Sequence, residues 1–495
     1  MTLLREFALY FAQMDRQPYL RLNFGADTSK GRITVEQIVS VIRAQIVGRT
    51  AVAGLRLPPV RVLAHQLHVS KNTVQAAYEE LKSQGLVESR NRLGLYITPP
   101  KAIQKPLSSW KIPFPEFRNI GPLEASARSR RGGINLSSVF IDPDLLPKEK
   151  IASCFRSVLT SPGLSFYSDY QGYRPLREKI AERLRKRGIS AEADHIVTTI
   201  GSQQALDLTF RMLEQPKIAT ENPAYHLAKV LLEMNDAEMV GLPLDPFTGA
   251  PLAKWEELFR KHRPKLVYLT SNFQNPTGYS YTTQEIQQIL ELSERYGFAI
   301  LEDDWGSDMM SFSEFRPCMR AIGGPNVLYV NSFTKKVLPS FRLGYLLANE
   351  NSVETLVNAK RVSAFGMPAV IEATLFEFLD RGYYDSHLKQ LHAELDERYR
   401  HALDLLRTLM PPEVRWTTPG GGPVLWVEVP ERVRLSVIQE RLKAKNITLA
   451  VKLSAFFGEP HLHGFMLGYA FLKPKELETG LERLAAEIRL ELETR

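Results

Sequence analysis

The stretch Asn331-Ser-Phe-Thr-Lys-Lys-Val-Leu-Pro-Ser-Phe-Arg-Leu-Gly-Tyr345 decides how the larger part of this chain is interpreted. Lys335 follows a hydroxyl residue, and Arg342 comes seven positions later. A lysine amine can bond covalently to a carbonyl cofactor, and an arginine can bind phosphate through two parallel hydrogen bonds. The pattern predicts a site for a Schiff-base cofactor that carries a phosphate, although alone it would also suit an ordinary basic loop.

Around this stretch, short β-rich runs alternate with helical patterns from about residue 134 onward. The runs cover residues 195–199, 217–220, 265–270, 298–302, 326–331 and 343–348. Such alternation is typical of a mostly parallel sheet with helices on both faces. After about residue 390, long amphipathic helices with few strands indicate a smaller C-terminal α+β lobe. We therefore expect a large α/β domain that ends in this lobe.

Three further segments follow predicted strands. Ile200-Gly-Ser-Gln-Gln204 opens a helix, whose backbone amides and Ser202 hydroxyl suit a phosphate dianion. Asn275-Pro-Thr-Gly278 offers a side-chain amide. Leu301-Glu-Asp-Asp-Trp305 offers carboxylates at the end of a predicted strand.

These four motifs, in this order, resemble the fold type I aminotransferases, which use pyridoxal 5'-phosphate. The resemblance covers residues 134–490 and implies that Lys335 is the Schiff-base lysine, with Lys336 as the adjacent competitor. It also implies a homodimer, because Tyr167 matches a tyrosine that reaches the neighbouring subunit's phosphate. The other implied cofactor-binding residues are Gly201, Ser202, Gln203, Tyr225 (stacked on the ring), Asn275 (on the phenolic oxygen), Asp303 (a buried carboxylate that holds the pyridine nitrogen protonated), Trp305, Ser332 and Arg342.

Two positions depart from this aminotransferase pattern. Trp305 replaces a tyrosine that donates to the ring oxygen, and an indole can donate only from a different place. Met466, in Gly464-Phe-Met-Leu-Gly-Tyr469, replaces the arginine that clamps the substrate carboxylate. Because methionine cannot form that bidentate contact, we expect efficient transamination of ordinary α-amino acids to be lost unless another arginine substitutes.

The N-terminal part of the chain is strongly basic. The whole chain has a net charge of +8, yet residues 1–132 alone carry 20 Lys and Arg against 9 Asp and Glu. A basic terminal unit suggests a polyanionic partner, since neutralised phosphates release counterions. Helical patterns over residues 33–47, 60–67 and from Ser70 onward, and a hairpin over 86–97, predict a winged helix-turn-helix. Charge alone would equally suit a merely solvated surface.

The stretch from Leu55 to Ile97 closely resembles the GntR-type winged helix. In its third helix Val74, Ala77, Tyr78 and Leu81 form the predicted buried stripe. The resemblance implies contacts to double-stranded operator DNA by Arg61, Lys71, Asn72, Thr73, Gln75, Arg90 and Arg92. Many relatives have arginine at the position of Gln75, so its partner base stays open.

A winged helix joined to an aminotransferase-like domain resembles the MocR-type regulators, a branch of the GntR family. This implies a transcriptional regulator that senses pyridoxal phosphate, an amine effector or both. Activator and repressor actions both fit, and some transaminase half-reaction stays open. Two alternatives are an aminotransferase with an accessory DNA-binding module and a dimer that uses the large fold only as a scaffold.

We predict four regions: an N-terminal extension (1–32), the winged helix (33–98), a linker (99–133) and the aminotransferase-like domain (134–495). Cys154 and Cys318 form no metal or redox motif, so we expect no metal site and a reducing, cytoplasmic location, at the bacterial nucleoid when DNA is bound. Arg5 and Glu6 interrupt the apolar run that a secretory signal needs, and no run is long enough to span a membrane.

Overall fold

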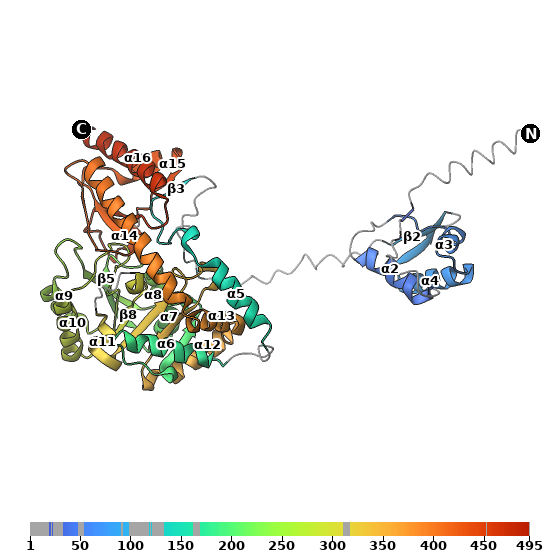
Figure 1. Cartoon of the computed structure of the whole chain (residues 1–495), viewed down its shortest axis with the longest axis horizontal. Helices are drawn as coiled ribbons and strands as arrows, with labels where there is room; N and C mark the ends of the chain where they lie inside the picture. Colours follow the sequence, from blue (N-terminus) through green and yellow to red (C-terminus); the bar gives the residue numbers. More distant parts are fainter. Residues whose placement is uncertain are drawn as a thin grey trace, which may run out of the picture. The chain divides into compact units, whose positions relative to one another are not determined.

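The computed structural model describes residues 19–20, 22, 33–47, 54–90, 93–98, 118, 120, 133–161, 169–309, 317–451 and 453–494. The chain divides into two compact units, Met1–Arg118 and Asn119–Arg495, which Figure 1 colours along the sequence. The division falls inside the predicted linker. Most of that linker and of the predicted extension 1–32 lies outside the described residues.

The N-terminal unit is the predicted winged helix. Its elements are α2 (Val35–Val47), α3 (Val60–Gln66), α4 (Lys71–Ser83), β1 (Val87–Arg90) and β2 (Gly94–Ile97), and the two strands pair antiparallel. Helix α4 begins where the sequence predicts, because the Ser70 hydroxyl accepts a hydrogen bond from the Thr73 amide at 3.1 Å. The predicted buried stripe of α4 is also confirmed.

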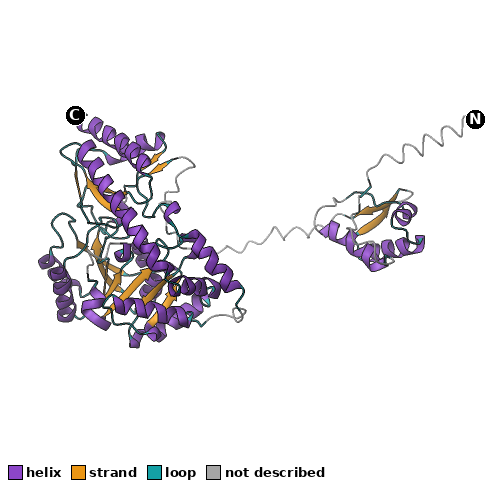
Figure 2. Ribbon diagram, in the orientation of Figure 1, coloured by secondary structure: helices purple, strands orange, loops and turns teal. Residues whose placement is uncertain are grey.

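The larger unit is built on a seven-stranded sheet (Figure 2). Its strand order is β4 (Ile196–Thr199), β10 (Gly344–Leu347), β9 (Val327–Ser332), β8 (Ala299–Asp303), β7 (Leu266–Leu269), β5 (Lys217–Asn222) and β6 (Glu238–Pro243). All pairs are parallel except the two made by β10. The six predicted strand runs are confirmed, but β6 was not predicted, and His195 belongs to a 3-10 turn, η3 (Ala193–His195).

Helices cover both faces of this sheet. Successive residues of a strand point to opposite faces, so neighbouring residues pack against different helices. Ile218 packs with one set of helices, whereas its neighbour Ala219 packs with another. The first set is α7 (Gly201–Arg211), α8 (His226–Met234) and α12 (Glu350–Ala364). The second is α9 (Leu252–His262), α10 (Thr283–Tyr296) and α11 (Met319–Gly323).

A third core cluster joins the β4 end of the sheet to the smaller lobe. It draws on α5 (Lys148–Leu159), α6 (Arg174–Lys186), α13 (Ala369–Asp380) and the long α14 (Tyr383–Leu409). The lobe contains β11 (Arg415–Trp416), β12 (Val424–Glu428), α15 (Leu435–Ala444), β13 (Ile447–Thr448), β14 (Gly464–Gly468) and α16 (Pro474–Glu493). Strand β3 (Ile134–Asn135) pairs with β13, so the start of the large unit also belongs to the lobe.

Short 3-10 turns complete the unit: η2 (Pro143–Leu145), η4 (Ser307–Met309), η6 (Gly324–Asn326), η7 (Pro339–Phe341) and η8 (Leu453–Ala455). Cys154 and Cys318 are buried free thiols. Across the described residues, no cluster of side chains has the makeup of a metal site, and no helix is long and apolar enough to span a bilayer.

Candidate functional site

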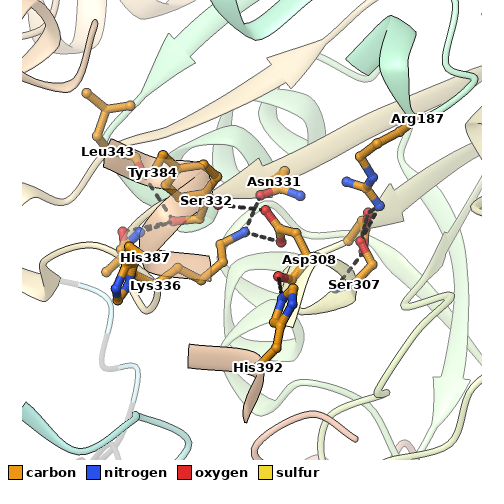
Figure 3. Close-up of polar contacts among 12 residues, drawn as sticks. Arg187, Ser307, Asp308, Asn331, Ser332, Lys336, Leu343, Tyr384, His387 and His392 are labelled. Atoms are coloured by element: carbon orange, nitrogen blue, oxygen red, sulfur yellow. Dashed lines mark hydrogen bonds and ion pairs between the residues drawn. The ribbon is translucent and has the colours of Figure 1, made fainter. Parts of the chain in front are cut away.

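The turn after β9 separates the two adjacent lysines. The Lys335 ammonium lies 3.6 Å from the centre of the Trp305 ring. Lys336 is fully buried, and its ammonium contacts Asp308 at 2.6 Å and Asn331 at 2.8 Å (Figure 3). Because these contacts occupy the Lys336 amine, Lys335 is the candidate for covalent attachment of a cofactor.

Three consecutive carboxylates, Glu302, Asp303 and Asp304, lie at the end of β8. Glu302 and Asp304 both accept hydrogen bonds from other parts of the protein. Glu302 accepts from the Met319 and Arg320 amides, each at 2.8 Å. Asp304 contacts Arg187 at 3.1 Å and the Tyr329 hydroxyl at 2.6 Å. These contacts explain both carboxylates as structural groups.

Asp303 is different. Its Oδ2 accepts from the Tyr268 hydroxyl at 3.1 Å, whereas its Oδ1 is buried and has no hydrogen-bond partner among the described residues. Burial raises the pKa of this carboxyl to about 6, although the positive charge of Lys335 and the Tyr268 hydrogen bond oppose the rise. An orphaned buried acceptor at this position fits a cationic N–H donor from a ligand ring.

A second part of the site can hold a phosphate. Helix α7 begins at Gly201 without a side-chain cap, so its first amides are available to an anion. Gly201 has φ +66°, which favours glycine, and a Cβ there would lie 3.4 Å from both the Arg342 guanidinium and the Thr334 hydroxyl. Ser332 donates to Thr334 at 2.8 Å. The helix start, two hydroxyls and a guanidinium therefore converge, with Ser202 and Gln203 in the first turn.

Tyr225 connects these two parts of the site. Its hydroxyl donates to Gln203 at 3.2 Å. Burial raises its pKa to about 12, and the charges of Asp303 and Arg342 act on it in opposite directions. The charges of Asp303 and Arg342 thus both act on Tyr225, the side chain predicted to stack on the cofactor ring.

The remaining predicted cofactor residues are placed as follows. Asn275 is buried in the loop after β7. The Trp305 N–H donates to the Phe273 carbonyl at 3.1 Å, so the indole presents its face, not its N–H, to Lys335. Tyr167 lies outside the described residues. The sequence analysis did not predict Thr334 or Tyr268 as residues of the site, although Thr334 is the hydroxyl residue directly before Lys335.

Met466 is buried in the middle of β14 and pairs across the strands with Trp426. Their strand neighbours Phe465 and Leu467 join the large core cluster, so Met466 and Trp426 lie on the other face of the lobe's sheet. An apolar side chain thus occupies the position that the aminotransferase pattern gives to an arginine.

The predicted DNA-contacting residues of the winged helix gather on α4 and the hairpin. Lys71, Asn72 and Gln75 are exposed on the first turns of α4, and Arg61 is exposed on α3. The Thr73 hydroxyl contacts that of Ser70 at 2.8 Å and so belongs to the helix cap. Gln75 donates to Glu79 at 3.1 Å.

In the hairpin, Arg90 is exposed, contacts Glu88 and lies 4.6 Å above the Tyr96 ring. Arg92 lies outside the described residues. The contacts of all these residues to DNA stay predictions.

The family model for "Aminotransferase class I and II" matches residues 133–455. The chain belongs to this family. Residues 34–97 match the model for "Bacterial regulatory proteins, gntR family". Pyridoxal phosphate is the cofactor of the aminotransferase family, and the orphaned Asp303 oxygen and the convergence at Gly201 fit its ring nitrogen and its phosphate.

Relatives of this aminotransferase-family chain share both units. It is 28% identical to the "Uncharacterized HTH-type transcriptional regulator YisV" of Bacillus subtilis over 92% of this chain and 95% of that one. It is 26% identical to the "Probable rhizopine catabolism regulatory protein MocR" of Rhizobium meliloti, over 90% and 92%. The domain combination is thus that of the MocR-type GntR regulators.

Among solved structures, the multiple substrate aminotransferase of Thermococcus profundus superimposes with a TM-score of 0.69 at 28% identity. The match covers 73% of this chain and 93% of that chain. A nearly whole enzyme therefore corresponds to the larger unit alone, and the winged helix is additional.

Proposed function

We propose that this protein is a homodimeric transcriptional regulator whose DNA binding responds to pyridoxal phosphate, or to an amine that reacts with it, at Lys335. The observation that supports the proposal is that groups suited to the cofactor, the unpartnered Asp303 oxygen and the convergence at Gly201, occur together with a methionine, Met466, where the aminotransferase pattern has a carboxylate clamp. Binding without efficient turnover is what a sensor requires.

The chain's own residues divide the work of holding the cofactor. Arg342 and the first amides of α7 bind the phosphate, together with Ser202, Gln203 and Ser332. Asp303 pairs with the ring nitrogen, Asn275 with the ring oxygen, and Tyr225 stacks on the ring. When bound, pyridoxal phosphate supplies an aldehyde that reacts with primary amines.

Lys335 provides the resident amine, and the indole face of Trp305 lies under its ammonium. An ammonium over an indole ring is stabilised by the ring quadrupole. Trp305 therefore holds Lys335 in place whenever the lysine is not covalently engaged, which suits a site where another amine competes for attachment.

Met466 also bears on the class of effector. A buried thioether offers no charge to a carboxylate, so the site favours an amine without an ordinary α-carboxylate, or pyridoxal phosphate itself. Regulation further requires that effector and operator DNA favour different conformers of the dimer, since a ligand with equal affinity for both shifts nothing.

The DNA part of the proposal rests on the GntR match. Asn72 at the exposed start of α4 reads a base edge in the major groove, and Arg61, Lys71, Thr73 and Arg90 contact the backbone. Such a protein acts in the cytoplasm, on the nucleoid.

The test combines a cofactor assay with a turnover assay on the full chain. The purified protein is mixed with pyridoxal phosphate, reduced with borohydride and digested, and the labelled peptide is sequenced. We expect a visible absorption band, label on Lys335, and no sustained transfer between an amino acid and an oxo acid. Lys335→Ala is the control and should fold without label.

Two results would overturn the proposal. Sustained turnover would make the protein an aminotransferase with an accessory DNA-binding module. Absence of any label, with DNA binding intact, would reduce the large unit to a dimerisation scaffold.

A further inference from the structure

Behind the cofactor residues lies a buried polar network that the proposed function does not use. Lys336 donates to Asn331, whose amide donates to the Tyr329 hydroxyl at 3.0 Å, and that hydroxyl donates to Asp304 at 2.6 Å. Lys336 and Asp304 are the immediate neighbours of Lys335 and Asp303. The network therefore joins the chain neighbours of the two residues to which the proposed function gives the cofactor's attachment and its ring nitrogen.

The network contains charges that are expensive to bury. Lys336, Asp304 and Tyr329 have no exposed surface. Lys336 lies 2.6 Å from Asp308, and Arg187 lies 3.1 Å from Asp304, so two positive and two negative groups balance. Burial alone would raise the pKa of Asp308, but Lys336 and Arg187 lower it to about 2.

A buried ion pair rarely improves stability over an apolar pair of similar volume. The pairing of Lys336 with Asp308 therefore calls for a role other than stability. Lys336 directly follows the attachment lysine in the chain, so we look for its role in the positioning of Lys335.

The network is also fixed to helix α14. Tyr384 donates to Asp308 at 2.8 Å, His387 Nε2 lies 2.7 Å from the Lys336 carbonyl, and His392 Nε2 lies 2.8 Å from the Asp308 carbonyl (Figure 3). One helix thus contacts the Asp308 side chain and the backbone carbonyls of both residues of the pair. The same helix reaches the smaller lobe, where Arg398 donates to the Leu472 carbonyl at 2.8 Å.

We propose that Lys336 and Asp308 are positioning residues: together with Asn331 and Tyr329 they fix the spacing between Lys335 and Asp303 and anchor the Lys335 turn to α14. The Lys336 amine itself contacts Asp308 and Asn331. It acts by locking the backbone of its neighbour, so the Lys335 amine is already aligned with the Asp303 side of the site before the cofactor arrives.

The test uses the neutral pair Lys336→Met with Asp308→Asn, which removes both charges and leaves neither unpaired. Two quantities are measured on the full chain: the dissociation constant for pyridoxal phosphate, and the rate at which acetic anhydride labels Lys335 in the cofactor-free protein, read by peptide mass spectrometry. The second readout needs no cofactor and no activity.

We expect the double variant to keep the wild-type unfolding temperature within a few degrees, yet to bind pyridoxal phosphate at least about tenfold more weakly, since small misplacements of a reacting group cost this much. The labelling rate of Lys335 should change about threefold or more. The matched control is Arg398→Met with Asp142→Asn, a buried ion pair of 2.8 Å at the lobe end of α14, which should change neither quantity more than about twofold.

A second, milder variant covers the case in which the double variant does not fold. Tyr329→Phe removes only the hydroxyl that connects Asn331 to Asp304 and should shift both readouts in the same direction. Its control is Tyr78→Phe in the winged helix, where the buried hydroxyl donates to Pro58 at 2.8 Å.

Wild-type values in both the double variant and Tyr329→Phe would overturn the inference, as would an equal loss in the control pair. The inference rests on the proposed function, but the two fail separately. If pyridoxal phosphate does not bind the wild-type protein, the proposed function is wrong, and the labelling of Lys335 still decides the role of Lys336.

Discussion

Replacing Asp303 with asparagine should stabilise the cofactor-free protein while weakening cofactor binding. Burial raises the pKa of this carboxyl from 3.8 to about 6. At 1.36 kcal/mol for each pKa unit, the ionised carboxylate costs about 3 kcal/mol of folding free energy at neutral pH. Asparagine keeps the acceptor for Tyr268 and removes this cost.

The sign of the effect depends on pH. Because the folded-state pKa is raised, the unfolded chain releases the proton first, and stability falls as pH rises through the interval from about 4 to 6. The advantage of Asp303→Asn should therefore be complete near pH 7 and should become small near pH 4, where the folded-state carboxyl is protonated and the unfolded-state carboxyl is close to its own pKa of 3.8.

Cofactor affinity should change in the opposite direction. A hydrogen bond to a charged group is worth about 1.5–3 kcal/mol, so loss of the pairing between Asp303 and the ring nitrogen should weaken pyridoxal phosphate binding roughly 10–150-fold. Asp303→Asn should thus raise the stability of the cofactor-free protein and lower its affinity for pyridoxal phosphate.

Urea unfolding of the cofactor-free full chain at pH 7 and pH 4, followed by tryptophan fluorescence, measures the first effect, and a cofactor titration measures the second. Asp304→Asn is the matched control. Its carboxylate is paired with Arg187, so that variant should lose roughly 3 kcal/mol of stability instead of gaining it. Reduced stability of Asp303→Asn at pH 7 together with unchanged cofactor affinity would refute the reasoning.

Three further predictions concern other parts of the chain. Ser70→Ala removes the cap of α4 and should destabilise the winged helix by about 1 kcal/mol, measured by urea unfolding, whereas exposed Ser40→Ala should not. Asn72→Ala should relax base preference in a selection from random duplexes, and Lys71→Ala should instead lower the salt dependence of binding by about one phosphate contact. Met466→Arg should raise turnover with an amino acid and an oxo acid by about tenfold or more, measured by product formation; no gain would mean that Met466 is not what limits transamination.

The sequence predicted elements best where one periodic face is buried. The stripe of α4 stands out because its buried positions recur at helical spacing, and β4 and β8 stand out because each contains a short run of buried apolar residues. Strand β6 was missed because it lies at the edge of the sheet, is partly exposed and contains Gly241 and Pro243. A half-exposed edge strand leaves little hydrophobic signal.

At the site, motif order and resemblance gave the candidate residues. Only the structure gives physical reasons to assign a role to one of two adjacent residues of the same type and not to the other. Lys336 differs from Lys335 because it is paired with Asp308, 28 positions away. Asp304 differs from Asp303 because Arg187, 117 positions away, lies against it. Partners at such separations leave no local pattern, so the network behind the site could not be predicted from the sequence.

The most direct test of the account measures operator affinity with and without pyridoxal phosphate in the wild-type protein and in Lys335→Ala. Duplexes selected from a random library by the full chain serve as the operator. We expect the cofactor to change wild-type affinity about fivefold or more and to leave Lys335→Ala unchanged. Equal affinities in the wild-type protein, with the cofactor attached to Lys335, would contradict the claim that this site regulates DNA binding.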